Sequence, residues 1–339
     1  MKCKTRFGWG PLLKTLYLHI GDGKTGTSFL QSLFAMHRKA LEDQGVLFPV
    51  VGTDHLQAEK GRVTGGNRAV VDDDDWTRHF ADTGSENILI SAEHLIKKVV
   101  ASPEEELGKW EAWGRDLGAE RIAVLLFIRD PVDHAASVFQ QAFKTGKIQA
   151  ASLSQFFLDY NRPRNHLDAI RNLMANGSFE VSVFNYSRCK SDLGSVAASW
   201  LGVDPETFKE APASVVNRGL TFAELRLVGS LARIEPTSGL SLGNAFSNSL
   251  PDLKPFRVLP SEDVQKQMLE KLAPAMAEIE KIVGSENALR PITRAPDTNL
   301  SRSLGWRQWR VVLDYASGNK KRLRNVWKAM RTKDVVDLS

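Results

Sequence analysis

Short apolar runs recur along the first two thirds of the chain, and segments with helical spacing of apolar positions lie between them. The runs predict strands at 15–20, 46–51, 87–91, 121–128 and 180–186. The intervening segments predict helices at 25–44, 131–143, 152–175 and 191–201. The run at 121–128 is apolar on both faces, as buried parallel strands are. This alternation predicts an open parallel β-sheet of about five strands flanked by helices on both faces.

The strand signals stop after about Pro205, and the rest of the sequence shows only helical periodicity and loops. Helices are predicted there at 221–233, 261–283, 302–316 and 319–332. We therefore expect a basic N-terminal extension at 1–14, an α/β core at 15–220 and a mainly helical part at 221–339 that packs on the core. The last of these ends in a basic amphipathic tail at 318–339.

The composition is that of a globular protein in water. Of the 339 residues, 42% are hydrophobic and 25% are charged, close to the averages for folded domains. No run approaches the roughly 18 apolar residues of a membrane span, and residues 1–14 lack the apolar run of a secretory signal. Cys3 and Cys189 are too few for a disulfide framework or a cysteine-rich metal site. These features predict a cytoplasmic location.

Positive charge is concentrated at the two ends of the chain. The net charge is +5, yet residues 318–339 alone hold seven basic and two acidic side chains, and residues 1–14 hold four basic and none acidic. The body between them is slightly acidic. Because a nucleic-acid-binding domain carries its basic charge on the folded body, this distribution argues against a nucleic-acid partner.

A loop between the first strand and the first helix has the composition of an anion-binding site. It reads GDGKTGTS from Gly21 to Ser28, and backbone N–H groups at such a helix N-terminus attract negative charge. Lys24 adds a positive charge, and Thr25, Thr27 and Ser28 add hydroxyl donors. The sequence is not the nucleoside-triphosphatase motif, in which the lysine follows the last glycine. A tight turn without a ligand is the alternative interpretation.

The residues Gly23-Lys24-Thr25-Gly26-Thr27-Ser28 resemble the first loop of the sulfotransferases that use 3′-phosphoadenosine 5′-phosphosulfate (PAPS), P-K-[ST]-G-T-[TS]. The preceding His19-Ile20-Gly21 makes bacterial members the most similar. The departure is Gly23, where proline is usual. The resemblance implies a fold like that of the P-loop nucleoside triphosphatases, with PAPS as co-substrate and adenosine 3′,5′-bisphosphate as product. It also implies that residues 24–28 bind the nucleotide.

A second motif follows the predicted strand at 121–128. Arg129-Asp130-Pro131 is followed by Ser137, eight residues after the arginine, and the same spacing in the family holds the 3′-phosphate. An arginine can bind a phosphate through two parallel hydrogen bonds. The alternative is that Arg129 pairs with Asp133 and that Ser137 is only a small residue in a helix interface.

Two further positions resemble the family through single residues. Tyr186 ends the predicted strand at 180–186, where relatives place a tyrosine near the adenine, but the acidic residues that usually follow are missing. Arg218, in Val216–Gly219, resembles a late basic loop that closes over the nucleotide. The implied nucleotide contacts are Lys24, Thr25, Gly26, Thr27, Ser28, Arg129, Ser137, Tyr186 and Arg218.

Sulfuryl transfer needs stabilisation of charge on the leaving oxygen and a base for the acceptor hydroxyl. Lys24 fits the first role. Glu93 and His94 follow the predicted strand at 87–91 and are both candidates for the base, since relatives use either residue type; His55 is a third. This chemistry requires no metal. His19 lies within the first strand, and we interpret it as a core residue.

We therefore expect a PAPS-dependent sulfotransferase that acts on a hydroxyl, and the resemblance favours a carbohydrate or glycoconjugate acceptor. Two other functions stay open. A nucleotide kinase would share the sheet and the anion loop, although the fourth strand ends in Arg129 rather than in an acid that could hold Mg²⁺. A non-catalytic nucleotide-binding module would bind adenosine 3′,5′-bisphosphate without transferring sulfate.

The predicted helix at 319–332 is amphipathic. Leu323, Val326, Trp327 and Met330 are spaced as one apolar stripe, and six basic residues occupy the other faces. The stripe either packs on the body of the protein or lies in an anionic membrane interface, where basic helices with tryptophan bind. The second interpretation predicts peripheral contact with the inner membrane surface. Trp306, Trp309 and Leu313 either extend this stripe or pack on the body.

Overall fold

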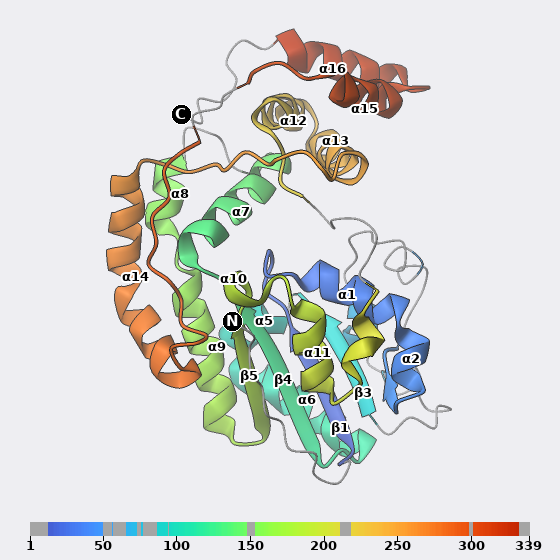
Figure 1. The fold of residues 1–339 in the computed structure, drawn as a ribbon, viewed down its shortest axis with the longest axis vertical. Helices are drawn as coiled ribbons and strands as arrows, with labels where there is room; N and C mark the ends of the chain where they lie inside the picture. Colours follow the sequence, from blue (N-terminus) through green and yellow to red (C-terminus); the bar gives the residue numbers. More distant parts are fainter. Residues whose placement is uncertain are drawn as a thin grey trace. The chain divides into compact units, whose positions relative to one another are not determined.

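The computed structural model describes residues 13–49, 56, 66–72, 76, 87–93, 95–147, 153–210, 218–297 and 301–331 (Figure 1). The chain forms two compact units. The first comprises Met1–Asp130, Asn161–Ala213 and Pro274–Arg290, and the second comprises Pro131–Tyr160, Ser214–Ala273 and Pro291–Ser339. The sequence predicts continuous domains that meet at residue 220, whereas each unit draws on three separate stretches.

The first unit is built on a parallel sheet of the predicted kind. Its strands are β1 Thr15–Ile20, β2 Val46–Leu47, β3 Asn87–Ala92, β4 Arg121–Ile128 and β5 Phe179–Asn185. All pairings are parallel, and the strand order is β2-β3-β1-β4-β5. Only β2 is much shorter than predicted, since it ends at Leu47 and is followed closely by Pro49, which has no N–H to donate.

Helices cover both faces of this sheet (Figure 1). On one face α1 (Thr27–Met36), α2 (Arg38–Glu42), α11 (Leu193–Leu201) and η3 (Pro205–Phe208) form a core with the strands. Strand residues Leu89 and Phe127 are fully buried in that core. On the other face lie α5 (Leu95–Ala101), α6 (Pro103–Leu117) and α9 (Arg162–Asn176). Short helices α4 (Arg68–Val71) and α10 (Tyr186–Cys189) complete the unit.

The second unit is helical. It contains α7 (Pro131–Lys144), α8 (Leu153–Asp159), α12 (Phe222–Ile234), α13 (Pro236–Ser249), α15 (Trp306–Ala316) and α16 (Lys320–Arg331). Helix α14 (Glu262–Val283) has Pro274 inside it, and the boundary between the units falls at that residue. Most of these helices match the predicted ranges within a few residues. No helix in the described part of the chain has the length and apolar character needed to cross a bilayer.

Helix α13 was not predicted, because its sequence PTSGLSLGNAFSNS is rich in glycine, serine and asparagine. Its small residues allow close packing against α12. A Cβ atom on Gly239 would lie 2.5 Å from the Cβ of Ala232, and one on Gly243 would also be in contact with side chains. The helix therefore depends on tertiary packing that its local propensity does not indicate.

Candidate functional site

The carboxyl edge of the sheet brings four of the predicted site residues together. Lys24 follows β1, Glu93 follows β3, Arg129 follows β4 and Tyr186 follows β5. Because the strands are parallel and β1 lies between β3 and β4, the segments after them emerge at the same edge. Ligands of open α/β sheets bind at such an edge.

The anion loop has an unusual backbone that its neighbours hold in place. Lys24 has a φ of +70°, the only positive φ of a residue other than glycine among the described residues, and Gly26 has a φ of +89°. A Cβ atom on Gly26 would lie 2.8 Å from the Tyr186 ring, so only glycine fits there. Arg129 Nη1 donates a 2.7 Å hydrogen bond to the main-chain oxygen of Lys24, and its guanidinium lies 5.3 Å from the centre of the Tyr186 ring.

The N-terminus of α1 is directed into this loop, and no side chain of the helix caps it or neutralises its partial positive charge. Its N-cap residue, Gly26, makes no side-chain capping bond, and the first turn has no acidic residue. The hydroxyls of Thr25 and Thr27 donate to the main-chain oxygen of Asp22 at 2.7 and 3.2 Å. They were predicted as donors to an anion, but here they shape the loop. The helix N-terminus and Lys24 are the positive groups that the loop presents.

Asp22 is a residue of the loop whose role is not evident from the sequence. Its side chain is buried, and Oδ1 accepts hydrogen bonds from its neighbour Gly23 N (2.8 Å) and from Arg162 Nη1 (3.0 Å). His166 Nε2 lies 2.9 Å from Oδ2. A proline at position 23 would lack the N–H that Gly23 donates, so the departure at Gly23 and the presence of Asp22 belong together. An acidic residue in an anion-binding loop indicates that basic residues from other parts of the chain pair with its carboxylate.

Lys24 and Glu93 are half-buried and lie within electrostatic range of each other. Burial lowers the pKa of the Lys24 ammonium, the Glu93 carboxylate acts against this, and Arg129 adds to the lowering. Burial raises the pKa of Glu93, Lys24 opposes the shift, and Asp22 adds to it. Ser28, in the first turn of α1, lies close enough to Glu93 to lower the pKa of that carboxyl. A carboxylate with a raised pKa next to an ammonium group is suited to accept a proton.

Of the three candidate bases, the structure describes only Glu93. Glu93 lies at the site, whereas His94 and His55 lie outside the described residues. His19, interpreted as a core residue, is fully buried, and its Nδ1 is 2.8 Å from Ser91 Oγ. Burial lowers its pKa to about 3, which keeps the ring neutral. The interpretation of His19 is confirmed.

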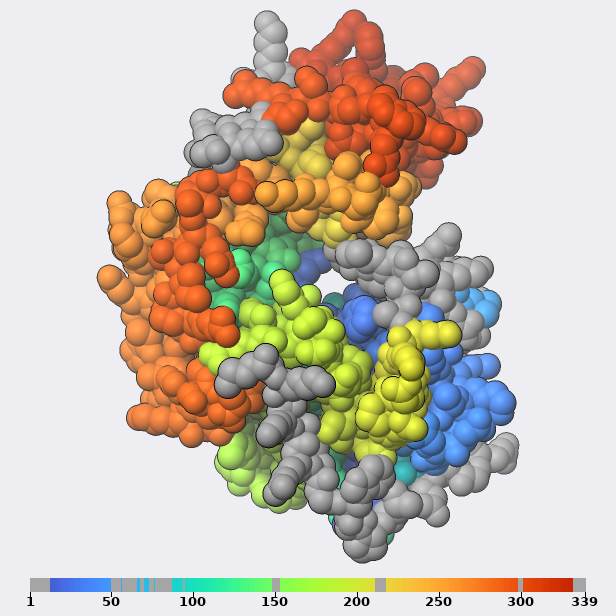
Figure 2. Space-filling view, in the orientation of Figure 1, coloured from blue at the N-terminus to red at the C-terminus, as the bar shows by residue number. Residues whose placement is uncertain are grey.

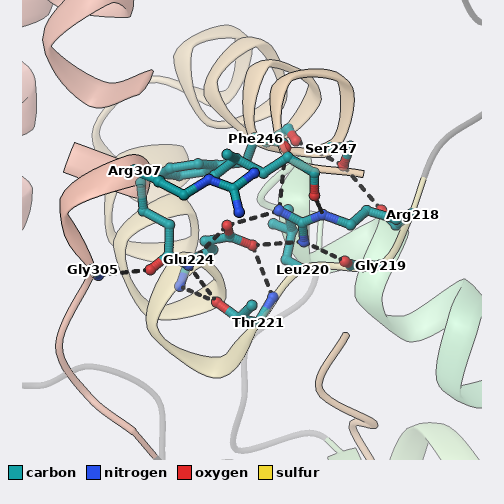
Figure 3. Close-up of polar contacts among 12 residues, drawn as sticks. Arg218, Gly219, Leu220, Thr221, Glu224, Phe246, Ser247, Gly305 and Arg307 are labelled. Carbon is teal, nitrogen blue, oxygen red and sulfur yellow. Dashed lines mark hydrogen bonds and ion pairs between the residues drawn. The ribbon is translucent and has the colours of Figure 1, made fainter. Parts of the chain in front are cut away.

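Arg218 is hydrogen-bonded to groups inside the second unit, so its guanidinium is not open to bind a phosphate (Figure 3). It is buried, and Nη1 and Nη2 pair with both carboxylate oxygens of Glu224 at 2.9 and 2.8 Å. Nη1 also donates to Gly219 O, Nη2 to Phe246 O, and Nε to Leu250 O. All five N–H donors of the guanidinium are thus used within the protein. We therefore leave Arg218 out of the candidate site.

Ser137 is half-buried on α7, in the second unit. Its predicted partnership with Arg129, which belongs to the first unit, stays a prediction. Asp133, the alternative partner for Arg129, forms an ion pair with Arg294 at 3.1 Å. Asp130 accepts hydrogen bonds from Asn185 Nδ2 and from the backbone of Arg290.

Comparisons of this chain with models of protein families, with curated proteins and with solved structures each find no match. Among the residues that the structure describes, no three His, Cys, Asp or Glu side chains are grouped as a metal site.

Proposed function

We propose that this chain is a sulfotransferase that transfers the sulfuryl group of PAPS to a hydroxyl of an acceptor, with a carbohydrate or glycoconjugate as the favoured class. The observation that carries the proposal is the clamped loop. Arg129 bonds the main-chain oxygen of Lys24 at 2.7 Å, and Glu93 lies within electrostatic range of the Lys24 ammonium. Lys24, assigned to the leaving group, and Glu93, assigned as the base, thus follow the neighbouring strands β1 and β3.

The residues of the first unit fit a nucleotide that carries phosphate and sulfate groups. The uncapped N-terminus of α1 and Lys24 would hold the anionic end, since backbone N–H groups and a helix dipole attract phosphate. The exposed part of Arg129 would hold the 3′-phosphate. Tyr186 would offer its ring to the adenine. In this proposal the α/β unit is of the P-loop type and the enzyme acts in the cytoplasm.

Bound PAPS would supply the sulfuryl group and its leaving phosphate. Glu93 takes the proton of the acceptor hydroxyl as the new oxygen–sulfur bond forms, and its raised pKa makes it a stronger base than an exposed glutamate. Lys24 offsets the negative charge on the oxygen that leaves sulfur, a role typical of preorganised cations. Arg129 contributes by holding the loop backbone that positions Lys24.

The test is incubation of the full chain with PAPS and a panel of glycans and glycolipids, followed by mass spectrometry for sulfated products and for adenosine 3′,5′-bisphosphate. We expect sulfate on at least one acceptor, and about 10²–10³-fold slower transfer with Lys24→Ala. Tight binding of adenosine 3′,5′-bisphosphate without transfer to any acceptor would favour a non-catalytic module. Phosphate transfer from ATP that requires Mg²⁺ would favour a kinase. Either result would overturn the proposal.

A further inference from the structure

Two helices of the second unit expose an unusual amount of apolar surface. Trp306 and Leu313 on α15 are 74% and 62% exposed, and Leu323, Trp327 and Met330 on α16 are 55%, 52% and 43% exposed. These five are almost half of the eleven large apolar side chains that are exposed in the described part of the chain. In Figure 2 the atoms of these helices, coloured red, form one continuous surface.

The exposed side chains are not needed to hold either helix on the unit. Helix α15 buries Val311, Val312 and Tyr315, and α16 packs on α12 through Val326 and Ala329. The stripe predicted on α16 is therefore divided, because Val326 is the one buried residue among its four members. Leu323, Trp327 and Met330 lie beside the buried face and stay outside. The apolar surface of α16 is thus buried at Val326 and Ala329 and exposed at Leu323, Trp327 and Met330.

Basic side chains flank the exposed apolar residues. Residues 301–331 contain nine basic side chains and a single acidic one, Asp314. Of these, Arg307 forms an ion pair with Asp252, and Lys321 forms one with Glu235. The exposed flank of α16 carries Lys320, Arg324, Lys328 and Arg331. The Arg331 guanidinium lies over the Trp327 ring, 4.6 Å from its centre, so a cation and an aromatic ring are in contact at the surface.

We propose that α15 and α16 form a docking surface for an anionic lipid bilayer. Tryptophan rings are favoured at the level of the lipid headgroups, where an apolar body and a polar N–H are both satisfied. Lysine and arginine beside them are attracted by anionic headgroups. Residues 301–331, with nine basic side chains, one acidic side chain and two exposed tryptophans, match that chemistry, whereas the core of a protein interface is depleted of charged residues. The proposal is independent of the proposed sulfotransferase activity.

The experiment is co-sedimentation of the full chain with phosphatidylcholine vesicles and with vesicles containing 30% phosphatidylglycerol, at low and high salt. Binding should require phosphatidylglycerol and weaken at high salt, because salt screens the attraction. Arg324→Gln with Lys328→Gln should weaken the partition coefficient roughly 30-fold. Trp306→Ser with Trp327→Ser should weaken it roughly tenfold or more.

Met174→Ser is the matched control, since Met174 is 53% exposed on α9 of the other unit. It should bind vesicles like the parent chain, and thermal unfolding of all variants should be unchanged. Equal binding of the tryptophan variant and the parent would overturn the proposal. So would absence of vesicle binding together with a dimer, seen by analytical ultracentrifugation, that the tryptophan substitutions dissociate. That result would make this surface a contact between copies of the chain.

Discussion

The guanidinium of Arg129 donates a 2.7 Å hydrogen bond to the main-chain oxygen of Lys24, 105 residues earlier in the chain. This bond links the segment after β4 to the loop after β1 and supports a lysine in the left-handed backbone region, where side chains other than glycine are strained. Arg129 therefore has a structural task in the loop in addition to the phosphate-binding task proposed for it. The two tasks can be separated by experiment.

Arg129→Ala should weaken binding of adenosine 3′,5′-bisphosphate more than binding of adenosine 5′-monophosphate, because only the first ligand carries the phosphate assigned to Arg129. Both affinities should fall to some extent, since the loop loses its clamp. Calorimetry with both nucleotides measures the difference. Arg121→Ala is the control, because Arg121 lies at the other end of β4 and pairs with Glu180 at 2.6 Å. Equal losses for the two nucleotides would leave Arg129 with the structural task alone.

Lys24→Ala should lower turnover by a factor on the order of 10²–10³, since a preorganised cation at the leaving group is removed. Lys24→Gly should lose the same activity without destabilising the fold, because glycine adopts a φ of +70° without strain. Its free energy of unfolding should stay within about 1 kcal/mol of the parent value. Lys39→Ala, on the exposed surface of α2, is the control. Near-normal turnover in Lys24→Gly would remove Lys24 from the mechanism.

Glu93→Gln should abolish transfer and leave nucleotide binding in place. In the parent chain, kcat/KM should fall as the pH falls through the pKa of Glu93, because the protonated carboxyl cannot act as the base. Burial raises this pKa, so the fall should occur above the usual range of glutamate. Lys97 holds the pKa down, and Lys97→Met should therefore move the acidic limb to higher pH. If Glu93→Gln stays active and the limb does not move, His94→Ala and His55→Ala become the variants to examine.

Asp22→Asn should destabilise the first unit. The carboxylate is buried between Arg162 and His166, and removing one member of a buried charged group costs about 3 kcal/mol. Urea denaturation followed by circular dichroism measures the change. Asp43→Asn, which affects an exposed pair with Lys39, should cost less than about 0.5 kcal/mol. A loss for Asp22→Asn no larger than that of the control would show that the three side chains do not act as a unit.

Arg218→Met should destabilise the second unit by about 3–5 kcal/mol, because it leaves the buried Glu224 carboxylate without its partner. Measured below its melting temperature, the variant should bind adenosine 3′,5′-bisphosphate as tightly as the parent chain does. A loss of affinity with unchanged stability would restore Arg218 to the nucleotide site.

The sequence alone determined the parallel sheet and much of the candidate site. Runs such as Arg121–Ile128 are apolar on both faces, and that pattern is stable only in a strand covered on both sides. Lys24, Glu93, Arg129 and Tyr186 could be predicted together because each lies at the carboxyl end of a predicted strand or within four residues after it. Because all strands of a parallel sheet end at the same edge, residues that follow different strands are expected to lie at that edge together.

Tertiary structure decided which partners the polar groups have. Asp22 meets His166 across 144 residues, and Arg218 meets Glu224 inside a buried network, whereas the sequence shows only that these residues can be charged. It also decided the course of α13, whose small residues form a helix by packing on Ala232, and the division of the α16 stripe between Val326 and Trp327. Periodicity shows which side chains share a helix face, but only packing determines how much of that face the rest of the protein covers.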